Sequence, residues 1–184
     1  MRDRAIVFCA LSTGLRRTEL VRLDLDQLNP ARTTCAAPSG PACCAYAARE
    51  APSAPCLSAD ARAALADYLE HERPGDADDG SAALFLAARS ISSRRPGGRP
   101  SVGTINDVCE RVGAWHDGDQ PDPERRLGGL HPHDLRHTFG FRLAEETGKD
   151  AYELERRLGH RSQRCIARYT NPPEHLSAGF AEHL

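Results

Sequence analysis

Helix-forming segments separated by capping and turn residues run along most of this chain, and they limit the folds that it can adopt. Apolar residues recur at helical spacing in "RDRAIVFCAL", the pattern breaks at "STG", and it restarts in "RRTELVRL". Ser58 is a plausible N-cap for a helix over residues 59–72, and Pro74 with the acidic turn 75–80 is expected to end it. The pattern predicts a mainly helical core.

Further helix signals occupy the C-terminal half of the chain. Ser101 precedes an apolar-patterned stretch at 102–115, and Pro132 suits the first turn of a helix that continues to residue 147. Asp150 and Ser162 are placed to cap two shorter helices. We therefore expect helices to follow one another with short connections from residue 101 onwards.

Strand signals are few. The run "AALFLA" at 82–87 is short and apolar, and another strand or two would have to come from residues 24–57. Proline and glycine mark surface loops at 92–100 and 116–129. Any sheet in this fold is expected to be small.

Length and composition suit one cytoplasmic domain. With 184 residues and 40% hydrophobic content the chain can form one core, since a domain near this size buries roughly 70% of its unfolded surface. No apolar run approaches the length that spans a bilayer, and the N-terminus lacks a secretory cleavage site after an adequate apolar stretch. We predict a cytoplasmic protein with no membrane partner.

Net charge limits how this chain can meet nucleic acid. The formal charge of −2 and the pI near 6.4 argue against nonspecific coating of nucleic acid, which depends on many uncompensated cations. Any DNA contact must be local. The seven cysteines are odd in number and form no C-x-x-C pair, so free thiols are expected.

Positive charge is concentrated near the C-terminal end, in "RRLGHRSQRCIARYTNPP" (156–173). This stretch holds five arginines and no carboxylate. Guanidinium groups bind phosphate oxygens in a bidentate way, so an anionic partner such as the DNA backbone is expected here. The predicted DNA-binding residues are Arg156, Arg157, Arg161, Arg164 and Arg168.

Four short motifs combine the residue types that phosphodiester chemistry needs. They are "TGLRRTEL" with Arg16, "HPHDLRHTF" with His133 and Arg136, "LGH" with His160, and Tyr169 nine residues later. Two arginines can grip the non-bridging oxygens of one phosphate and stabilise the charge that develops in the transition state. A phenol, with a pKa of about 10, becomes a useful nucleophile only when cations lower that pKa and a base takes its proton.

Each of these residues has a commoner structural explanation when taken singly. Arg16 could be a solvated helix residue paired with Glu19, His137 could merely pack or cap, and Tyr169 could be a half-buried aromatic residue. The joint occurrence of all four motifs in one order outweighs these explanations.

In this order, the motifs resemble those of the tyrosine recombinase, or phage integrase, family. The resemblance rests on a Gly-Leu-Arg-x-x-Glu-Leu box at 14–20, a His-x-Leu-Arg-His-Thr-Phe box at 133–139, a Leu-Gly-His box at 158–160, and the tyrosine that follows. It covers nearly the whole chain. It implies the catalytic-domain fold of that family over residues 1–184, which is α+β and mainly α with a small antiparallel sheet.

The resemblance also implies roles for the site residues. Arg16 and Arg136 would bind the scissile phosphate, His133 would act in acid–base catalysis, His160 would hydrogen-bond the phosphate, and Tyr169 would attack it. Such enzymes cleave and rejoin double-stranded DNA as tetramers, through a 3′-phosphotyrosyl intermediate and a free 5′-hydroxyl. The implied function is site-specific recombination or integration, with no metal, ATP or other cofactor and no small-molecule substrate.

A zinc cluster is an alternative from another class of site. Its ligands would be His131, His133, His137, His160 and Cys165. No glutamate follows the first histidine, as a metalloprotease helix requires, and an arginine of the same helix would place like charge beside the ion. We therefore expect no metal.

Two departures from the family pattern leave open an impaired or truncated remnant that at most binds DNA weakly. Only fifteen residues precede Arg16, so we expect the N-terminal helical clamp domain of the family to be absent. The family also has a catalytic lysine on a hairpin before the second arginine box. The one lysine here, Lys149, follows Arg136, and Arg49 is the nearest cation to the expected place, although a guanidinium gives up a proton poorly.

Residues 29–56 do not match the rest of the chain. They include four cysteines and five prolines but no leucine, isoleucine or valine. Either this is a low-complexity surface loop, or the segment is translated out of its ancestral frame. In both cases we expect disorder in place of the hairpin, and loss of the general acid would cost about 10² to 10⁴ in cleavage rate.

Overall fold

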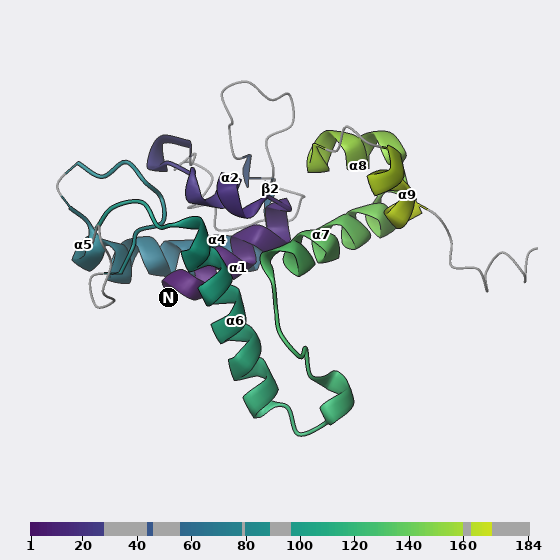
Figure 1. Ribbon diagram of the computed structural model, residues 1–184. Coiled ribbons are helices and arrows are strands. Elements are labelled where there is room, and N and C mark those ends of the chain that lie inside the picture. The colour runs from purple at the N-terminus through teal and green to yellow at the C-terminus, as the bar shows by residue number, and fades with distance from the viewer. Residues whose placement is uncertain (28–43, 46–55, 79, 89–96, 160–162, 171–184) are drawn as a thin grey trace, which may run out of the picture. The chain divides into compact units, whose positions relative to one another are not determined.

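The computed structural model (Figure 1) describes residues 1–27, 44–45, 56–78, 80–88, 97–159 and 163–170. The chain divides into two compact units, Met1–Phe139 and Gly140–Leu184. The boundary falls inside helix α7 (Pro132–Glu146), so that α7 contributes to both units. Helices make up most of the described part of each unit, as the sequence predicts.

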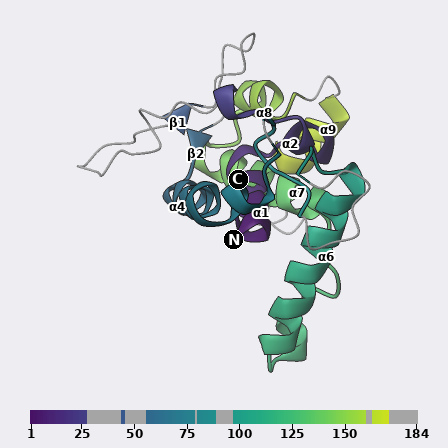
Figure 2. The same ribbon diagram turned by 90° about the vertical axis from the view of Figure 1, so that its left-hand side faces the viewer.

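The core of the first unit forms around α1 (Arg2–Thr13). This helix packs against α4 (Ala59–Asp67) and α6 (Val102–Asp119), and α2 (Arg17–Val21) also contacts α6 (Figure 1, Figure 2). Full burial of each large apolar side chain stabilises the fold by about 1.5–3 kcal/mol. Buried members of this core include Ile6, Leu20, Leu65, Phe85, Ile105 and Val108.

Two serine caps begin helices where the sequence predicts them. Ser58 Oγ accepts a hydrogen bond from the backbone N–H of Ala61 at 3.2 Å, and Ser101 Oγ accepts one from Thr104 at 3.1 Å. Each cap satisfies an N–H group that has no partner inside the first helical turn. Both predicted helix starts are confirmed.

The predicted end of the helix after Ser58 is wrong. The chain continues from α4 through a π-helical turn, η2 (Tyr68–Glu72), into α5 (Arg73–Asp76), which contains Pro74. Proline is tolerated in a first helical turn because its missing N–H would have no intrahelical acceptor there. The π turn restarts the helix just before Pro74, so the proline does not break it.

The apolar run 82–87 is buried from Ala83 to Ala87, but it is not the predicted strand. Leu84, Phe85 and Leu86 are each 1% exposed or less. In the described part of the chain, its strand-type pairing is limited to one isolated bridge between Asp24 and Ala83. The apolar pattern therefore identified core residues but not their backbone conformation.

Polar side chains hydrogen-bond the backbone of this run, in addition to its two backbone hydrogen bonds with Leu23 and Leu25 beside the bridge. Tyr68 Oη accepts from the N–H of Leu86 at 3.0 Å, and Arg2 donates to the Leu86 carbonyl oxygen at 3.0 Å. Burial raises the pKa of the Tyr68 hydroxyl to about 12. Arg73 donates, at 2.8–3.2 Å, to the carbonyl oxygens of Ser81, Ala83 and Leu84.

One short antiparallel pair of strands is described. Strand β1 (Cys44–Ala45) pairs with β2 (Cys56–Leu57), which leads into α4 (Figure 2). Two residues on each side are less than the small sheet that the resemblance implies, and that sheet stays a prediction. Most of the unusual segment 29–56, with Arg49, lies outside the described residues.

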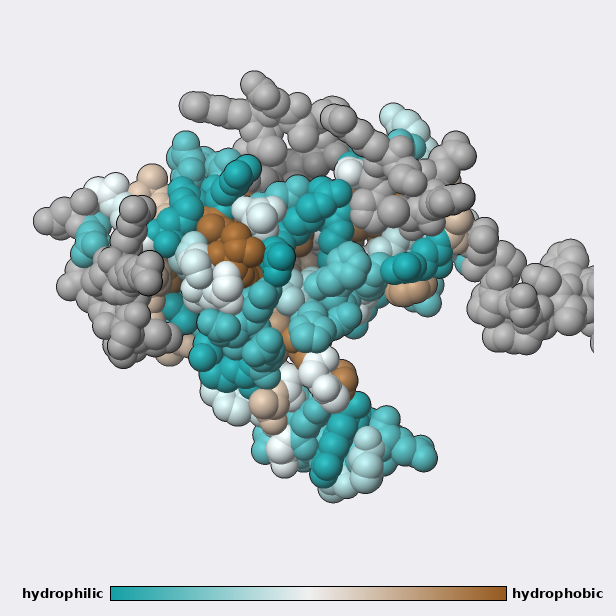
Figure 3. Space-filling view, viewed as in Figure 1, coloured by the Kyte–Doolittle hydropathy of each residue, from teal (hydrophilic) through white to brown (hydrophobic). Residues whose placement is uncertain are grey.

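An arm formed by α6 and the 3₁₀ turn η3 (Pro123–Arg125) extends from the core of the first unit (Figure 1). Helix α6 runs to Asp119, four residues beyond the predicted end and into a predicted loop. Asp117 stabilises this longer helix, because its carboxylate accepts from the N–H groups of Leu127 and Gly128 at 2.7 and 2.9 Å. Figure 3 shows that the arm is largely hydrophilic.

The second unit contains the end of α7, α8 (Ala151–Leu158) and α9 (Gln163–Thr170). Asp150 caps α8 as predicted, whereas Ser162 lies outside the described residues. Lys149 follows α7 with a positive φ of 65°, and its N–H donates to the Ala144 carbonyl oxygen at 2.6 Å. Among the helices described, none combines the length and apolarity that crossing a membrane requires.

Candidate active site

The turn between α1 and α2 has a tight steric requirement at Gly14. Gly14 ends α1 in the left-handed conformation, with φ 63°, and its N–H donates to the Ala10 carbonyl oxygen at 2.9 Å. A Cβ atom on Gly14 would come within 2.3 Å of the Phe139 ring. Both the backbone conformation and the lack of space therefore favour glycine at the position two residues before Arg16.

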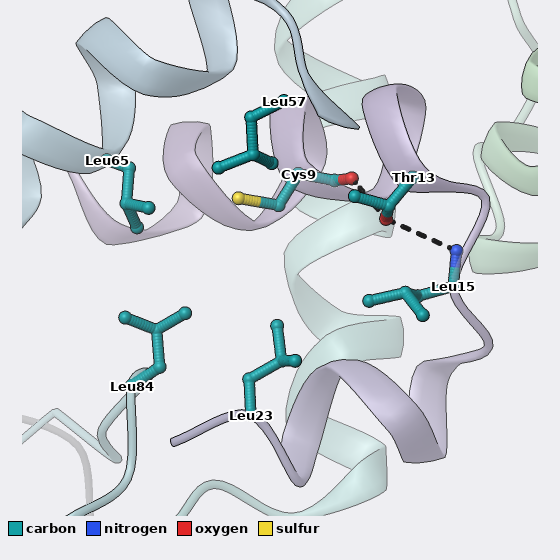
Figure 4. A pocket seen from close by; sticks show the side chains of 7 residues that line it. All are labelled: Cys9, Thr13, Leu15, Leu23, Leu57, Leu65 and Leu84. Carbon is teal, nitrogen blue, oxygen red and sulfur yellow. Dashed lines mark hydrogen bonds between the residues drawn. The ribbon is translucent and has the colours of Figure 1, made fainter. Parts of the chain in front are cut away.

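A small apolar pocket lies next to this turn (Figure 4). Thr13 Oγ1 donates to the Cys9 carbonyl oxygen at 2.7 Å and accepts from the Leu15 N–H at 3.3 Å. Burial raises the pKa of the Cys9 thiol to about 12, so the thiol stays protonated and unreactive at neutral pH. The pocket is lined by Cys9, Thr13, Leu15, Leu23, Leu57, Leu65 and Leu84.

Arg16 stands at the N-cap position of α2 and is exposed. Its backbone N–H donates to Glu19 Oε2 at 2.6 Å, and its guanidinium lies 3.2 Å from Glu19 Oε1. Glu19 therefore contacts both the backbone and the side chain of Arg16. This pairing fixes the start of α2 and leaves the Arg16 side chain 45% exposed, which suits contact with an external phosphate.

Arg136 joins the second arginine box to the first. It lies on α7, is 4% exposed, and donates a hydrogen bond from Nη1 to the carbonyl oxygen of Gly14. The two boxes are 122 residues apart in sequence at this contact. The first unit thus brings the Arg136 side chain to the turn that leads into Arg16.

His133 and His137 form a pair on the same helix. Their ring centroids lie 4.1 Å apart with the rings at 75°. His133 is exposed at the N-terminal end of α7, three residues before Arg136 and thus about one turn from it. An imidazole in this place is available for proton transfer to a group bound beside α7.

The zinc alternative gains no support from the described residues. Among them, no three histidine, cysteine, aspartate or glutamate side chains come together in a way that could hold a metal ion. His160 lies outside the described residues, as does the side chain of Cys165.

Tyr169 lies on α9 in the second unit and is 4% exposed. Its ring contacts the Phe141 ring in a T-shaped arrangement, with the centroids 5.1 Å apart and an angle of 72°. A Cβ atom on Gly140 would lie 2.7 Å from Cε1 of the tyrosine. The predicted nucleophile is thus packed directly against the backbone of α7 at Gly140.

The arginine-rich stretch 156–173 contains no carboxylate, but a carboxylate that precedes it on α8 pairs with two of its arginines. Glu153, one turn earlier on α8, lies 2.8 Å from Arg156 and 3.5 Å from Arg157. The hydrogen bond from Arg156 holds the pKa of the Glu153 carboxyl below its ordinary value. Arg168 on α9 is exposed, while Arg161 and the Arg164 side chain lie outside the described residues.

Sequence reasoning missed four residues of these sites. Glu153 could have been found, because it stands three and four residues before the two arginines on one helix. Gly14 also carried a signal, since glycine commonly ends a helix. Gly140 and Phe141 carried none, because their role depends on a ring that is 29 and 28 residues away in sequence.

Comparison with known proteins identifies the family. The family model described as "Phage integrase family" matches residues 1–175. This chain belongs to the phage integrase family. The four motifs, from the Arg16 box to Tyr169, all fall within the matched region.

Curated tyrosine recombinases resemble the chain over most of its length. Tyrosine recombinase XerD of Mycobacterium tuberculosis is 33% identical over 173 residues, covering 92% of this chain and 48% of the relative. Tyrosine recombinase XerC of Pseudomonas fluorescens is 32% identical over 181 residues, covering 97% and 51%. The chain spans about half the length of these curated relatives.

Solved structures of recombinases share the fold. The XerA recombinase superposes with a TM-score of 0.66 at 23% identity, covering 99% of this chain and 58% of that one. The XerH recombinase, crystallised with its difH substrate before cleavage, gives a TM-score of 0.65 at 17% identity, covering 98% and 46%.

Proposed function

We propose that this chain is the catalytic domain of a site-specific DNA recombinase that cleaves and rejoins double-stranded DNA through Tyr169. Membership of the phage integrase family supports the reaction class. The observation that carries the proposal is the hydrogen bond from Arg136 to the Gly14 carbonyl oxygen. This contact places the Arg136 guanidinium at the turn that leads into Arg16, which supports a phosphate clamp built from the two arginines.

In the proposed step, the Tyr169 phenolic oxygen attacks the scissile phosphorus. The P–O5′ bond breaks, the phenolic proton passes to a base, and the leaving 5′-oxygen takes up a proton to become a hydroxyl. Arg16 and Arg136 hold the non-bridging oxygens, and their charges stabilise the transition state more than the ground state. His133 moves the proton and His160 donates to the phosphate. Rejoining is the reverse step on a partner strand, so no cofactor is needed.

DNA would also contact the exposed face of the second unit. We assign the phosphate contacts there to the five predicted arginines, Arg156, Arg157, Arg161, Arg164 and Arg168. The pairing of two of them with Glu153 reduces the positive charge that this face presents. Binding by this domain alone should therefore be weak and salt-dependent. We propose that the active assembly is a homotetramer on DNA in the cytoplasm, and that its catalytic domain includes a small antiparallel sheet.

A second candidate function is DNA binding with impaired cleavage. Lys149 supports it, because the one lysine of the chain is used in the backbone turn that ends α7. That place differs from the hairpin where the family has its lysine. Without a lysine the leaving 5′-oxygen lacks its usual proton donor, and cleavage would slow by about 10²–10⁴.

The test is covalent capture of DNA by the full chain. The protein is incubated with sheared genomic DNA from its source and denatured in detergent, and the DNA that stays attached is sequenced. We expect adducts at one recurring site, linked through Tyr169 in peptide mass spectra. Tyr169→Phe should form no adduct while it retains DNA affinity.

Two other outcomes would be decisive. Binding by the wild type without any adduct would favour the impaired alternative. An adduct on a residue other than Tyr169 would refute the proposed nucleophile.

A further inference from the structure

His133 stands in the first turn of α7, where a helix offers an exposed side chain little support. On a helix, a side chain meets the residues three and four positions away. The residues three and four positions before His133 precede α7, which begins at Pro132. Within the helix, the positions that can support the His133 ring are therefore Arg136 and His137.

His137 makes a direct contact with that ring. The two ring centroids lie 4.1 Å apart, and the ring planes meet at 75°. Long side chains on a helix lean back toward its N-terminus. The His137 side chain therefore leans onto His133 from the following turn. The two rings meet edge to face, which is an arrangement that aromatic side chains prefer.

His137 is more firmly held than the ring that it contacts. It is half-buried, whereas His133 is exposed. Its two neighbours in sequence are also fixed. Arg136 donates to the carbonyl oxygen of Gly14, and the Thr138 hydroxyl donates to the carbonyl oxygen of Asp134 at 2.9 Å. This part of α7 is therefore a fixed support against which an exposed ring can be oriented.

We infer that His137 is a positioning residue, whose ring orients the His133 imidazole for proton transfer during DNA cleavage. The inference rests on the proposed function, in which His133 moves the proton. An acid or base must come within about 2.6–3.2 Å of the group with which it exchanges a proton. An unsupported side chain spreads over several rotamers, and only some of them present a ring nitrogen to a bound phosphate.

The effect of His137 should be modest and should act only through His133. Edge-to-face aromatic contacts favour the paired arrangement by about two- to tenfold. When only a fraction of the molecules is competent, the observed rate falls in proportion to that fraction. Loss of the His137 ring should therefore slow cleavage about two- to tenfold. Loss of His133 itself should slow it by about 10² to 10⁴.

The first measurement is an NMR spectrum of the full chain without DNA, isotope-labelled at histidine Cε1. His133→Asn identifies the His133 signal, which the ring current of His137 displaces from the position of a free histidine. His137→Gln keeps a polar side chain but removes the ring, so the His133 signal should move to the free position. His137→Phe keeps a ring without nitrogen atoms, so the signal should stay displaced.

His116→Gln is the matched control, because it removes the same ring from an exposed position on α6. It should leave the His133 signal in place. If His137→Gln does not fold, all histidine signals will collapse to the free position. His137→Leu then becomes the deciding variant, since leucine fills the space without a ring.

The second measurement is the single-turnover rate at which the captured DNA forms the Tyr169 adduct. His137→Gln should be about two- to tenfold slower than the wild type, while His137→Phe and His116→Gln should be close to it. In a His133→Asn background, His137→Gln should have no further effect, because a residue that acts only through His133 has nothing left to position.

Several results would overturn the inference. An unchanged His133 signal in folded His137→Gln would show that His137 does not hold the ring. Equal slowing by His137→Phe and His137→Gln, or further slowing in the His133→Asn background, would show that His137 acts in its own right. A wild type that forms no adduct would refute the proposed function and, with it, the role of His137 in cleavage. That failure is separate from a failure of the NMR measurement, which needs no DNA.

Discussion

The buried guanidinium of Arg136 donates to the carbonyl oxygen of Gly14, so a residue of α7 fixes the turn that precedes Arg16. This contact gives the two proposed phosphate-binding arginines different structural roles. Arg136 supports the fold as well as the site. Arg16 forms an exposed ion pair with Glu19.

Replacing each arginine by alanine should separate these roles. Arg136→Ala leaves a buried carbonyl oxygen without this donor, and the free energy of unfolding should fall by about 1–3 kcal/mol. Arg16→Ala should lower it by less than about 1 kcal/mol, as exposed ion pairs do. Both variants should lose DNA adduct formation. Denaturant titration provides the stabilities, and equal losses in the two variants would contradict the assigned roles.

Gly14→Ala should destabilise the first unit for two reasons that can be measured separately. The left-handed backbone costs about 1–2 kcal/mol for a residue with a Cβ atom, and the clash with Phe139 adds about 1–3 kcal/mol. Gly148→Ala isolates the first cost, since Gly148 has the same φ of 63° with open space around it. Combining Gly14→Ala with Phe139→Ala should cost less than the sum of the single changes. Strict additivity would show that the ring does not cause the clash.

Glu153→Gln should strengthen DNA binding. The substitution releases Arg156 and Arg157 from their carboxylate partner, so up to two more phosphates can be neutralised and the salt dependence should become steeper by about one to two ions. Glu155→Gln is the matched control, because it removes the same charge from an exposed position on the same helix. Fluorescence anisotropy with labelled duplex DNA across salt concentrations measures both. Equal gains in the two variants would point to net charge alone.

Acid should loosen the tip of the α6–η3 arm before the core unfolds. The hydrogen bond from the Leu127 N–H holds the pKa of the Asp117 carboxyl below its ordinary value of 3.8. A lowered folded-state pKa means that the contribution of Asp117 is complete above the unfolded-state pKa and is lost as pH falls through the folded-state pKa. The change should therefore appear below pH 3.8.

Trp115 can report this transition, because it is the one tryptophan of the chain and lies two residues before Asp117. Its emission should shift below that pH in the wild type and in Asp119→Asn. In Asp117→Asn the shifted signal should already be present at neutral pH. A wild-type transition that survives in Asp117→Asn would assign it to another group.

Local rules in the sequence predicted helices and their caps well. Ser58, Ser101 and Asp150 cap helices as expected, because an N-cap depends only on the next three residues. The prediction of a strand at 82–87 was wrong because its partners are not local. Its backbone hydrogen-bonds both the side chains of Arg2, Tyr68 and Arg73 and the backbone of Leu23 and Leu25. No local pattern in the run predicts these partners.

In the candidate site, too, the sequence predicts some features and not others. The order of the motifs predicts Arg16, His133, Arg136 and Tyr169 as site residues, since a family pattern is a property of the sequence itself. The hydrogen bond between Arg136 and Gly14 and the packing of Tyr169 against Gly140 depend on the tertiary structure. They link residues that are 122 and 29 positions apart.

The hydrogen bonds from Arg73 and Arg2 to the run 82–87 also bear on aggregation. An extended apolar segment with unpaired carbonyl groups is a template on which a strand from another molecule can add. Here guanidinium groups occupy the carbonyl oxygens of Ser81, Ala83, Leu84 and Leu86. Because guanidinium stays charged at any physiological pH, that protection does not depend on acidity. These four carbonyl oxygens are thereby kept from accepting hydrogen bonds from a strand of a neighbouring copy.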